Sequence, residues 1–225
     1  MAQTEESAVL PEVLDHYAEA HGAESGSGDL VSVSLDGTLV QGGREYDLRV
    51  RRKRPHSIRY RLSRGAVSVV CGFDGEQAWM RRQKGGDVTI RDLSDDALPL
   101  LRGEAAFAGP LVEQADNPEL EARLEAVRPP EEGGVYVIDV FADGKRRYRY
   151  HLDTGTYRVR LRRVFDEAGE LRLETRYRDY RLVDGFPFAF EIENRDETGV
   201  LSTVRVSELE VNTGLLSFYF EKPSR

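Results

Sequence analysis

The sequence predicts a mainly β protein: an antiparallel meander of about ten or eleven strands, with one N-terminal helix and a central helical interruption. Apolar and polar residues alternate over most of the chain, as they do on strands that bury one face. Asp74–Gly75 and Asp143–Gly144, which suit tight hairpin turns, separate alternating runs. A length of 225 residues fits one all-β domain, so we expect a single domain over residues 1–225.

The first element is expected to be an amphipathic helix over residues 9–21, preceded by a polar tail at 1–8. Apolar residues recur there at the spacings of three and four that define a helix face. They are Val9, Leu10, Val13, Leu14, Tyr17 and Ala18. Gly22 is a suitable stop, and residues 23–29 are interpreted as a short flexible link.

Strands are expected wherever the apolar period falls to two. In the first half they are 30–40, 44–52, 57–62 and the two arms of a hairpin within 66–82. In the second half they are 134–142, 146–152, 157–165, 171–183, 186–194, 200–211 and 212–220. Residues 94–128 have helix-like or irregular apolar spacing and precede Pro129–Pro130, so short helical segments and loop are expected there as a lid insertion.

Residues 146–163 place a basic residue or His151 at nearly every second position, which predicts one apolar and one cationic face. The apolar set is Tyr148, Tyr150, Leu152, Tyr157, Val159 and Leu161, and the cationic set is Arg147, Arg149, His151, Arg158, Arg160 and Arg162. The cationic set fits either a solvated face with acidic partners such as Glu174 or a nucleic-acid surface. With 32 basic and 40 acidic residues the net charge is −8, which disfavours phosphate-backbone binding, so no nucleic-acid partner is expected.

The apolar face of the predicted sheet is larger than the predicted helices can cover. About ten strands of ordinary length offer roughly 25–30 inward side chains, whereas a helix buries about a third of its residues. Large exposed apolar patches are unusual on soluble monomers. The sheet is therefore expected to curl on itself, to pair with another chain, or to hold an apolar ligand.

No motif for catalysis or metal binding stands out. The histidines His16, His21, His56 and His151 are dispersed. The stretch GAESGSG lacks the Lys and Ser/Thr of a phosphate loop, and its SGSG lacks the strand-to-helix turn around an esterase serine. Cys71 lies in a strand-like run and is expected to be a buried thiol. We expect a protein without enzyme activity, cofactor or metal, and an enzyme acting on a hydrophobic substrate is the third-ranked alternative.

Fragments spread over nearly the whole chain resemble the LolA/LolB-like superfamily, especially outer-membrane lipoprotein-sorting proteins. They are VLDHYAEAHG at 13–22, FDGEQAWM at 73–80, FAGPLVE at 107–113, YHLDTGTYRVRLRR at 150–163, YRDYRLVDGFPFAFEIE at 177–193 and VNTGLLSFYFEKP at 211–223. The resemblance implies a curved, incomplete (half) antiparallel barrel, with helices as a lid over a hydrophobic cavity for acyl chains. It also implies residence in the periplasm, with a signal peptide missing from this sequence, or a lipid anchor if the missing leader ended in Cys.

The principal hypothesis is a periplasmic carrier or binding protein for lipoproteins or other acylated amphiphiles, which exchanges them with membrane-bound donor and acceptor proteins in outer-membrane biogenesis. The alternative is an envelope sensor or interaction module of the same fold that binds a protein partner. The predicted cavity lining is Val33, Leu35, Leu48, Val50, Ile58, Tyr60, Leu62, Trp79, Tyr148, Tyr150, Tyr157, Val159, Leu161, Phe188 and Phe190, with Leu10, Leu14, Leu98 and Leu101 on the lid. Trp79, Phe188 and Phe190 also fit a role as core residues.

Overall fold

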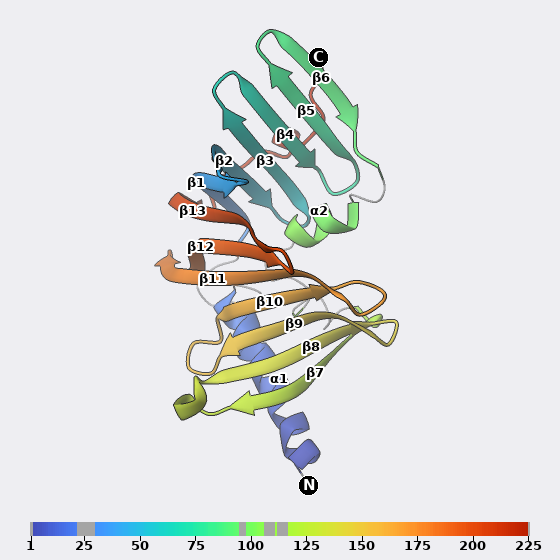
Figure 1. Ribbon diagram of the computed structural model, residues 1–225, viewed down its shortest axis with the longest axis vertical. Helices are drawn as coiled ribbons and strands as arrows, with labels where there is room; N and C mark the ends of the chain where they lie inside the picture. Colours follow the sequence, from blue (N-terminus) through green and yellow to red (C-terminus); the bar gives the residue numbers. More distant parts are fainter. Residues whose placement is uncertain (1, 22–29, 95–97, 106–110, 112–116, 225) are drawn as a thin grey trace. The chain divides into compact units, whose positions relative to one another are not determined.

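The structure is a computed structural model that describes residues 2–21, 30–94, 98–105, 111 and 117–224. Its helices are α1 (Ala2–Ala20) and α2 (Leu98–Ala105), with the short 3-10 helices η2 (Pro130–Glu132) and η3 (Ser217–Tyr219). Its strands, shown in Figure 1, are β1 (Ser32–Gln41), β2 (Arg44–Lys53), β3 (Ser57–Arg64), β4 (Val67–Phe73), β5 (Ala78–Lys84), β6 (Asp87–Asp92), β7 (Leu120–Arg128), β8 (Val135–Ala142), β9 (Lys145–Asp153), β10 (Val159–Phe165), β11 (Leu171–Val183), β12 (Phe186–Asp196) and β13 (Gly199–Val211).

These strands form one antiparallel sheet in the order β6-β5-β4-β3-β2-β1-β13-β12-β11-β10-β9-β8-β7. Strands β6 and β7 stand at the two ends of this order, so the sheet of the described residues is open. Almost every strand pairs with its neighbour in sequence, as expected for a meander joined by tight turns. The predicted fold class, mainly β and antiparallel with an N-terminal helix and a central helix, is confirmed.

The chain divides into two compact units. The first contains residues 1–29 and 110–203, and the second contains residues 30–109 and 204–225. Strand β13 begins in the first unit and ends in the second. The single domain expected over residues 1–225 stays a prediction.

The predicted helical insertion ends too late, because residues 120–128 form strand β7. Its half-buried Leu120, Ala122 and Leu124 alternate with exposed charged residues, the period of a strand with one wet face. Leu, Ala, Glu and Arg are strong helix formers, and their propensity obscured this alternation. The short, largely exposed strand β6 was also missed. The described residues form 13 strands, where about ten or eleven were expected.

Both ends of the chain differ from the prediction. The backbone is helical from Ala2, where a tail was expected at 1–8, and the predicted last strand at 212–220 is irregular apart from η3. Asn212, with a φ of 54°, directly follows the last residue of β13. The predicted stop at Gly22, the link at 23–29 and parts of the 94–128 insertion lie outside the described residues.

In the first unit, α1 packs on one face of the strands from β7 to β10 (Figure 1). Val13 and Tyr17 are its buried residues, and they meet strand residues spaced two apart. The buried strand residues of this cluster are Ile138, Val140, Tyr150, Leu152 and Val159. In the second unit, Leu101 and Ala105 of α2 pack on Ile58, Phe73 and Ala78. Each unit thus covers part of an apolar sheet face with one helix.

Candidate functional site

The predicted lining residues separate into two sets, one on each unit. In the second unit, strand register places seven of them on the face that α2 covers. Leu35, for example, lies opposite Val50, which lies opposite Tyr60. The seven are Val33, Leu35, Leu48, Val50, Ile58, Tyr60 and Leu62. Leu98 and Leu101 of α2 pack against this face, and their role as lid residues stays a prediction.

Cys71 lies on the same face and is buried, as predicted. Burial raises the pKa of its thiol above the usual value. Because a protonated, buried thiol is a poor nucleophile, Cys71 acts as a packing residue.

In the first unit, the predicted lining residues Tyr148, Tyr150, Tyr157 and Val159 belong to the cluster beneath α1. Leu10 and Leu14 of α1 are half-buried against the same cluster. The sequence-based assignment of these residues to one apolar surface with its covering helix therefore agrees with their packing. Their role in ligand binding stays a prediction.

Leu161 is the exception on β10. A β-bulge between Val159 and Leu161 shifts the register, so Leu161 lies opposite His151, on the charged face. The same bulge brings Arg162 opposite Tyr150, on the α1 face, where its charge acts on Tyr17 and Tyr150. The predicted positions of Leu161 among the apolar residues and of Arg162 among the cationic ones are therefore wrong.

Trp79 is the exception in the second unit. Trp79 pairs with Gly72, which pairs with Arg59. Its ring therefore lies on one face of the sheet, and Ile58 and Phe73 lie on the other face. A Cβ at Gly72 would lie 2.4 Å from the indole, so only glycine leaves room for the ring. Nε1 of Trp79 donates a hydrogen bond to the carbonyl oxygen of Phe220 at 2.8 Å, and the residue is 0% exposed. Trp79 is a core anchor, and its assignment to the lining shared with Ile58 is wrong.

Phe188 and Phe190 lie on β12 and alternate in phase with the buried Phe186. Phe190 is buried, and the guanidinium carbon of Arg181 lies 4.2 Å from its ring centre. Phe188 is half-buried. Their position favours the core role for Phe190, whereas the lining role of Phe188 stays a prediction.

Tyrosines concentrate beneath α1. Burial raises the pKa of Tyr17, Tyr150 and Tyr180 above the usual value, because a phenolate would be poorly solvated there. The hydroxyl of Tyr180 donates to the carbonyl oxygen of Val159 at 2.8 Å. The hydroxyl of Tyr150 is buried and has no hydrogen-bond partner. The surface beneath α1 is thus apolar but contains hydrogen-bond donors that remain protonated. The position of Tyr180 near Tyr17 was not predicted, since it depends on how the helix docks.

The opposite face of the first unit's sheet bears paired charges. Asp139 is buried and accepts two hydrogen bonds from Arg149, at 2.6 and 2.7 Å. Arg163 donates to Glu174 at 2.9 Å. These pairs join neighbouring strands, as cross-strand opposite charges do on solvated sheets. The acidic partners expected for the 146–163 stretch are present, but Asp139 and Glu174 are themselves buried.

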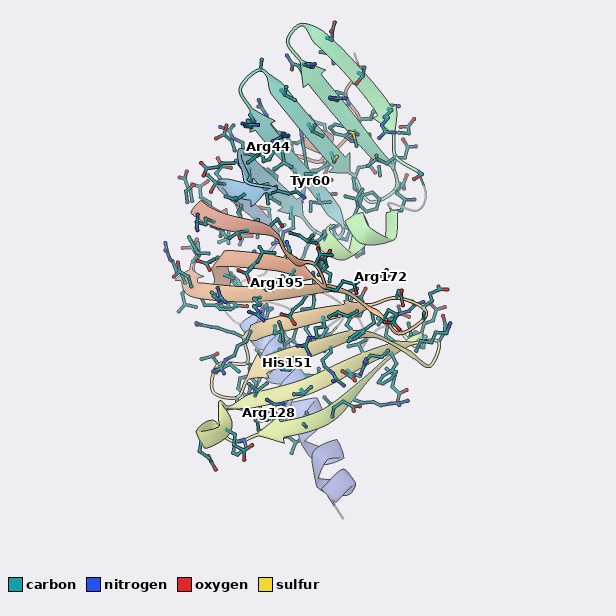
Figure 2. All side chains as sticks on the ribbon, in the orientation of Figure 1. Arg44, Tyr60, Arg128, His151, Arg172 and Arg195 are labelled. Carbon is teal, nitrogen blue, oxygen red and sulfur yellow. The ribbon has the colours of Figure 1, made fainter. Side chains whose placement is uncertain are left out.

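His151 lies on β9 within the charged face (Figure 2), and its Nε2 is buried without a hydrogen-bond partner. Burial, together with the positive charges of Arg163, Arg128 and Arg149, lowers the pKa of His151 to about 4. The unfolded chain binds a proton at this residue at higher pH than the folded chain does. Stability is therefore fully present above pH 6.5 and lost as the pH falls toward about 4.

We expect His151→Gln to flatten the fall in stability between pH 6.5 and about 4. Allowing for the partial exposure of His151, the difference is expected to be about 1–2 kcal/mol. Urea unfolding at several pH values measures it, and His56→Gln on an exposed histidine is the matched control. Parallel pH profiles for the wild type and His151→Gln would contradict the expectation.

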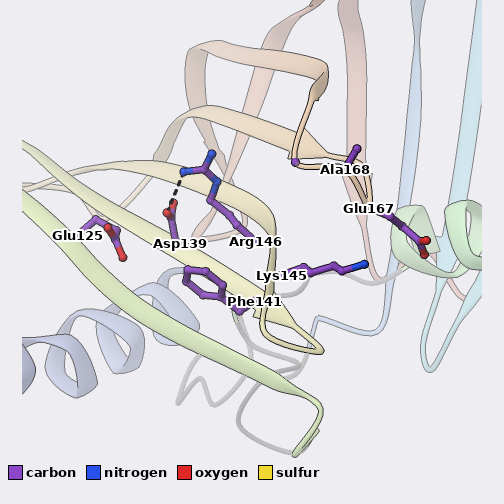
Figure 3. A pocket seen from close by; sticks show the side chains of 8 residues that line it. Glu125, Asp139, Phe141, Lys145, Arg146, Glu167 and Ala168 are labelled. Atoms are coloured by element: carbon purple, nitrogen blue, oxygen red, sulfur yellow. Dashed lines mark hydrogen bonds and ion pairs between the residues drawn. The ribbon is translucent and has the colours of Figure 1, made fainter.

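A pocket of about 370 Å³ opens on the charged side of the first unit (Figure 3). Its lining is Glu125, Asp139, Phe141, Lys145, Arg146, Glu167, Ala168 and Gly169. Arg146 contacts Asp139 at 3.5 Å there. Charged side chains of both signs suit water and small polar solutes, not an acyl chain.

Among the described residues, no group of three His, Cys, Asp or Glu side chains could hold a metal ion. Within the same ranges, neither helix combines the length and the apolar character that a bilayer span requires.

No protein-family model matches the sequence, and no curated protein matches it. Solved structures do match its fold. One is a LolA superfamily protein of Nitrosomonas europaea, with a TM-score of 0.63 and 14% identity, covering 95% of this chain and 97% of that one. The LolA-like fold inferred from the sequence fragments is confirmed.

Two other solved structures match equally well. An outer membrane lipoprotein-sorting protein domain of Vibrio parahaemolyticus has a TM-score of 0.63 and 14% identity, over 95% of this chain and 97% of that one. A DUF1329 family protein of Desulfovibrio piger has a TM-score of 0.62 and 12% identity, over 94% and 97%. At these identities the likeness shows a common fold.

Proposed function

We propose that this protein is a periplasmic carrier or binding protein for lipoproteins or other acylated amphiphiles. The observation that carries the proposal is the apolar sheet face of the first unit, part of which α1 covers through Val13, Tyr17 and three half-buried residues. Removing α1 would uncover a surface of aliphatic and tyrosine side chains that also includes Arg162. The LolA-like fold and the description of the Vibrio parahaemolyticus structure as a lipoprotein-sorting domain support the choice of ligand.

The energetic basis of carriage is the burial of acyl chains. Each methylene removed from water contributes about 0.8 kcal/mol, so one acyl chain between α1 and the sheet is held without any polar contact. Release requires α1 to return to the sheet or a partner surface to take the chain. In this scheme, membrane-bound proteins donate and accept the amphiphile, and the protein itself catalyses no reaction.

Native mass spectrometry tests binding directly. Protein purified without detergent is incubated with a synthetic lipopeptide that carries a diacylglyceryl-cysteine. A complex of one protein with one lipopeptide is expected. Protein that is consistently empty and rejects both this probe and palmitic acid contradicts the proposed function.

A reversible tether tests whether α1 is the cover. The rings of His16 on α1 and Tyr157 on the sheet side lie 4.7 Å apart between centres, so cysteines at these two positions can be bridged by a short, reducible thiol crosslinker. Native Cys71 is buried and does not compete. Crosslinking is expected to lower lipopeptide uptake at least about tenfold and reduction to restore it, with the unreacted double variant as control. Unchanged uptake would show that α1 is not the cover.

A second candidate function is an interaction module that binds a protein partner. Leu216 and Phe218, near the C-terminus, are 61% and 67% exposed. Exposed neighbouring apolar side chains are typical of protein-binding surfaces. Capture of one envelope protein by the wild type, lost on Phe218→Ser, together with empty protein in mass spectrometry, would favour this function.

A further inference from the structure

The hydroxyl of Tyr150 is a buried polar group of the first unit that makes no hydrogen bond to the part of the chain that the structure describes. Tyr150 is 3% exposed, and its hydroxyl oxygen is buried without a hydrogen-bond partner. Buried hydroxyls almost always have a hydrogen-bond partner, because a buried hydroxyl that makes no hydrogen bond destabilises the fold. Phenylalanine would fill the same space without that penalty. The hydroxyl therefore costs stability in the structure as it stands.

The surroundings of Tyr150 place this hydroxyl on the surface proposed to receive acyl chains. Tyr150 lies opposite Ile138 on one side and opposite Arg162 on the other. Val13 and Tyr17 of α1 belong to the same cluster, so α1 lies over it. If α1 moved away, the hydroxyl would be uncovered on this surface.

The protonation state of Tyr150 makes it a donor. Burial raises the pKa of Tyr150 well above its usual value, so the hydroxyl keeps its proton at neutral pH. A hydrocarbon chain offers no acceptor to this proton. The carbonyl oxygen of an ester-linked acyl chain is a good acceptor at the end of an otherwise apolar group.

We propose that the Tyr150 hydroxyl donates a hydrogen bond to the carbonyl oxygen of an ester-linked acyl chain bound beneath α1. This inference rests on the proposed function and narrows its ligand class from apolar chains in general to fatty-acyl esters. Binding then satisfies a donor that is unsatisfied in the empty protein. The unsatisfied hydroxyl lowers the stability of the empty protein, and in the loaded protein it favours ligands that have an ester carbonyl over ligands that lack one.

Binding of two matched lipopeptides tests the inference. One carries two ester-linked palmitoyl chains and the other carries two ether-linked hexadecyl chains, which lack the carbonyl. The wild type is expected to bind the ester about fivefold to tenfold more tightly than the ether, by isothermal titration calorimetry. Tyr150→Phe is expected to bind both with the affinity that the wild type shows for the ether.

Thermal unfolding of the empty protein supplies an independent readout. Tyr150→Phe is expected to raise the melting temperature, since it removes an unsatisfied hydroxyl. The matched control Tyr180→Phe is expected to lower it, because that hydroxyl donates to Val159. A lower melting temperature for Tyr150→Phe would mean that the hydroxyl has a structural partner and would overturn the inference.

The outcomes separate the two proposals. Equal affinity of the wild type for ester and ether, or an ester preference that survives in Tyr150→Phe, overturns the role of Tyr150 while the carrier function stands. Rejection of both lipopeptides by the wild type overturns the carrier function and this inference with it.

Discussion

Replacement of Trp79 with alanine is expected to lower the free energy of unfolding of the second unit by about 3–5 kcal/mol. The indole is 0% exposed and fills the space that Gly72 leaves open. It also holds the C-terminal segment through the carbonyl oxygen of Phe220. Its removal therefore leaves a cavity and an unsatisfied carbonyl at once. Urea unfolding followed by far-ultraviolet circular dichroism measures the loss.

Trp79→Phe separates the two contributions. A phenyl ring keeps much of the packing but cannot donate to Phe220, so it is expected to cost about 1–2 kcal/mol. If Trp79→Ala cost less than about 1 kcal/mol, the position of the indole beneath the C-terminal segment would be wrong. Met80 follows Trp79 on the opposite face and is half-buried, so Met80→Ala is the matched control on the same strand.

Replacement of Asp139 with asparagine is expected to lower the free energy of unfolding of the first unit by about 3 kcal/mol. Asp139 is 1% exposed and accepts both hydrogen bonds that Arg149 directs at it. Asparagine has nearly the same shape but no charge, so the guanidinium of Arg149 would remain without its counter-ion. Chemical unfolding at neutral pH provides the measurement.

An exposed pair on the neighbouring strand controls for hydrogen-bond geometry. Glu121 accepts two hydrogen bonds from Arg123, at 2.8 and 2.7 Å, but both side chains are exposed. Glu121→Gln is expected to leave the unfolding midpoint nearly unchanged. The double variant Asp139→Leu with Arg149→Met is expected to recover most of the loss, because it removes the buried carboxylate together with its counter-ion. A loss in Glu121→Gln equal to that in Asp139→Asn would contradict the importance of burial.

Alternation of apolar residues predicted the strands closely where one face of a strand is buried and the other is wet. The predicted strand at 171–183 has the bounds of β11, because the turns before and after it contain glycine. Residues 120–128 were misread because strong helix formers occupy a strand whose pairing with β8 decides its state. Pairing partners distant in sequence are not visible in a local pattern.

The two-residue periodicity predicted which residues of the candidate site share a sheet face. It did not predict the β-bulge or the segments that cover each face. Alternation along β2 and β3 correctly placed Val50 and Tyr60 on one face of the sheet. The bulge in β10 reversed Leu161 and Arg162, because an extra residue in a strand inverts every side chain after it. Alternation along the strand also put Trp79 and Met80 on opposite faces. Which of these faces is covered depends on the course of the C-terminal segment, which lies over the indole.

The open ends of the sheet have a consequence for the solution behaviour of the protein. Strands β6 and β7 each have one neighbour among the described strands, so each presents a free row of backbone donors and acceptors. Such rows invite edge-to-edge polymerisation. The exposed residues Glu121, Arg123 and Glu125 of β7, and Asp87, Arg91 and Asp92 of β6, put charge along both margins. A second molecule would have to desolvate those charges to add a strand, which disfavours edge-to-edge pairing.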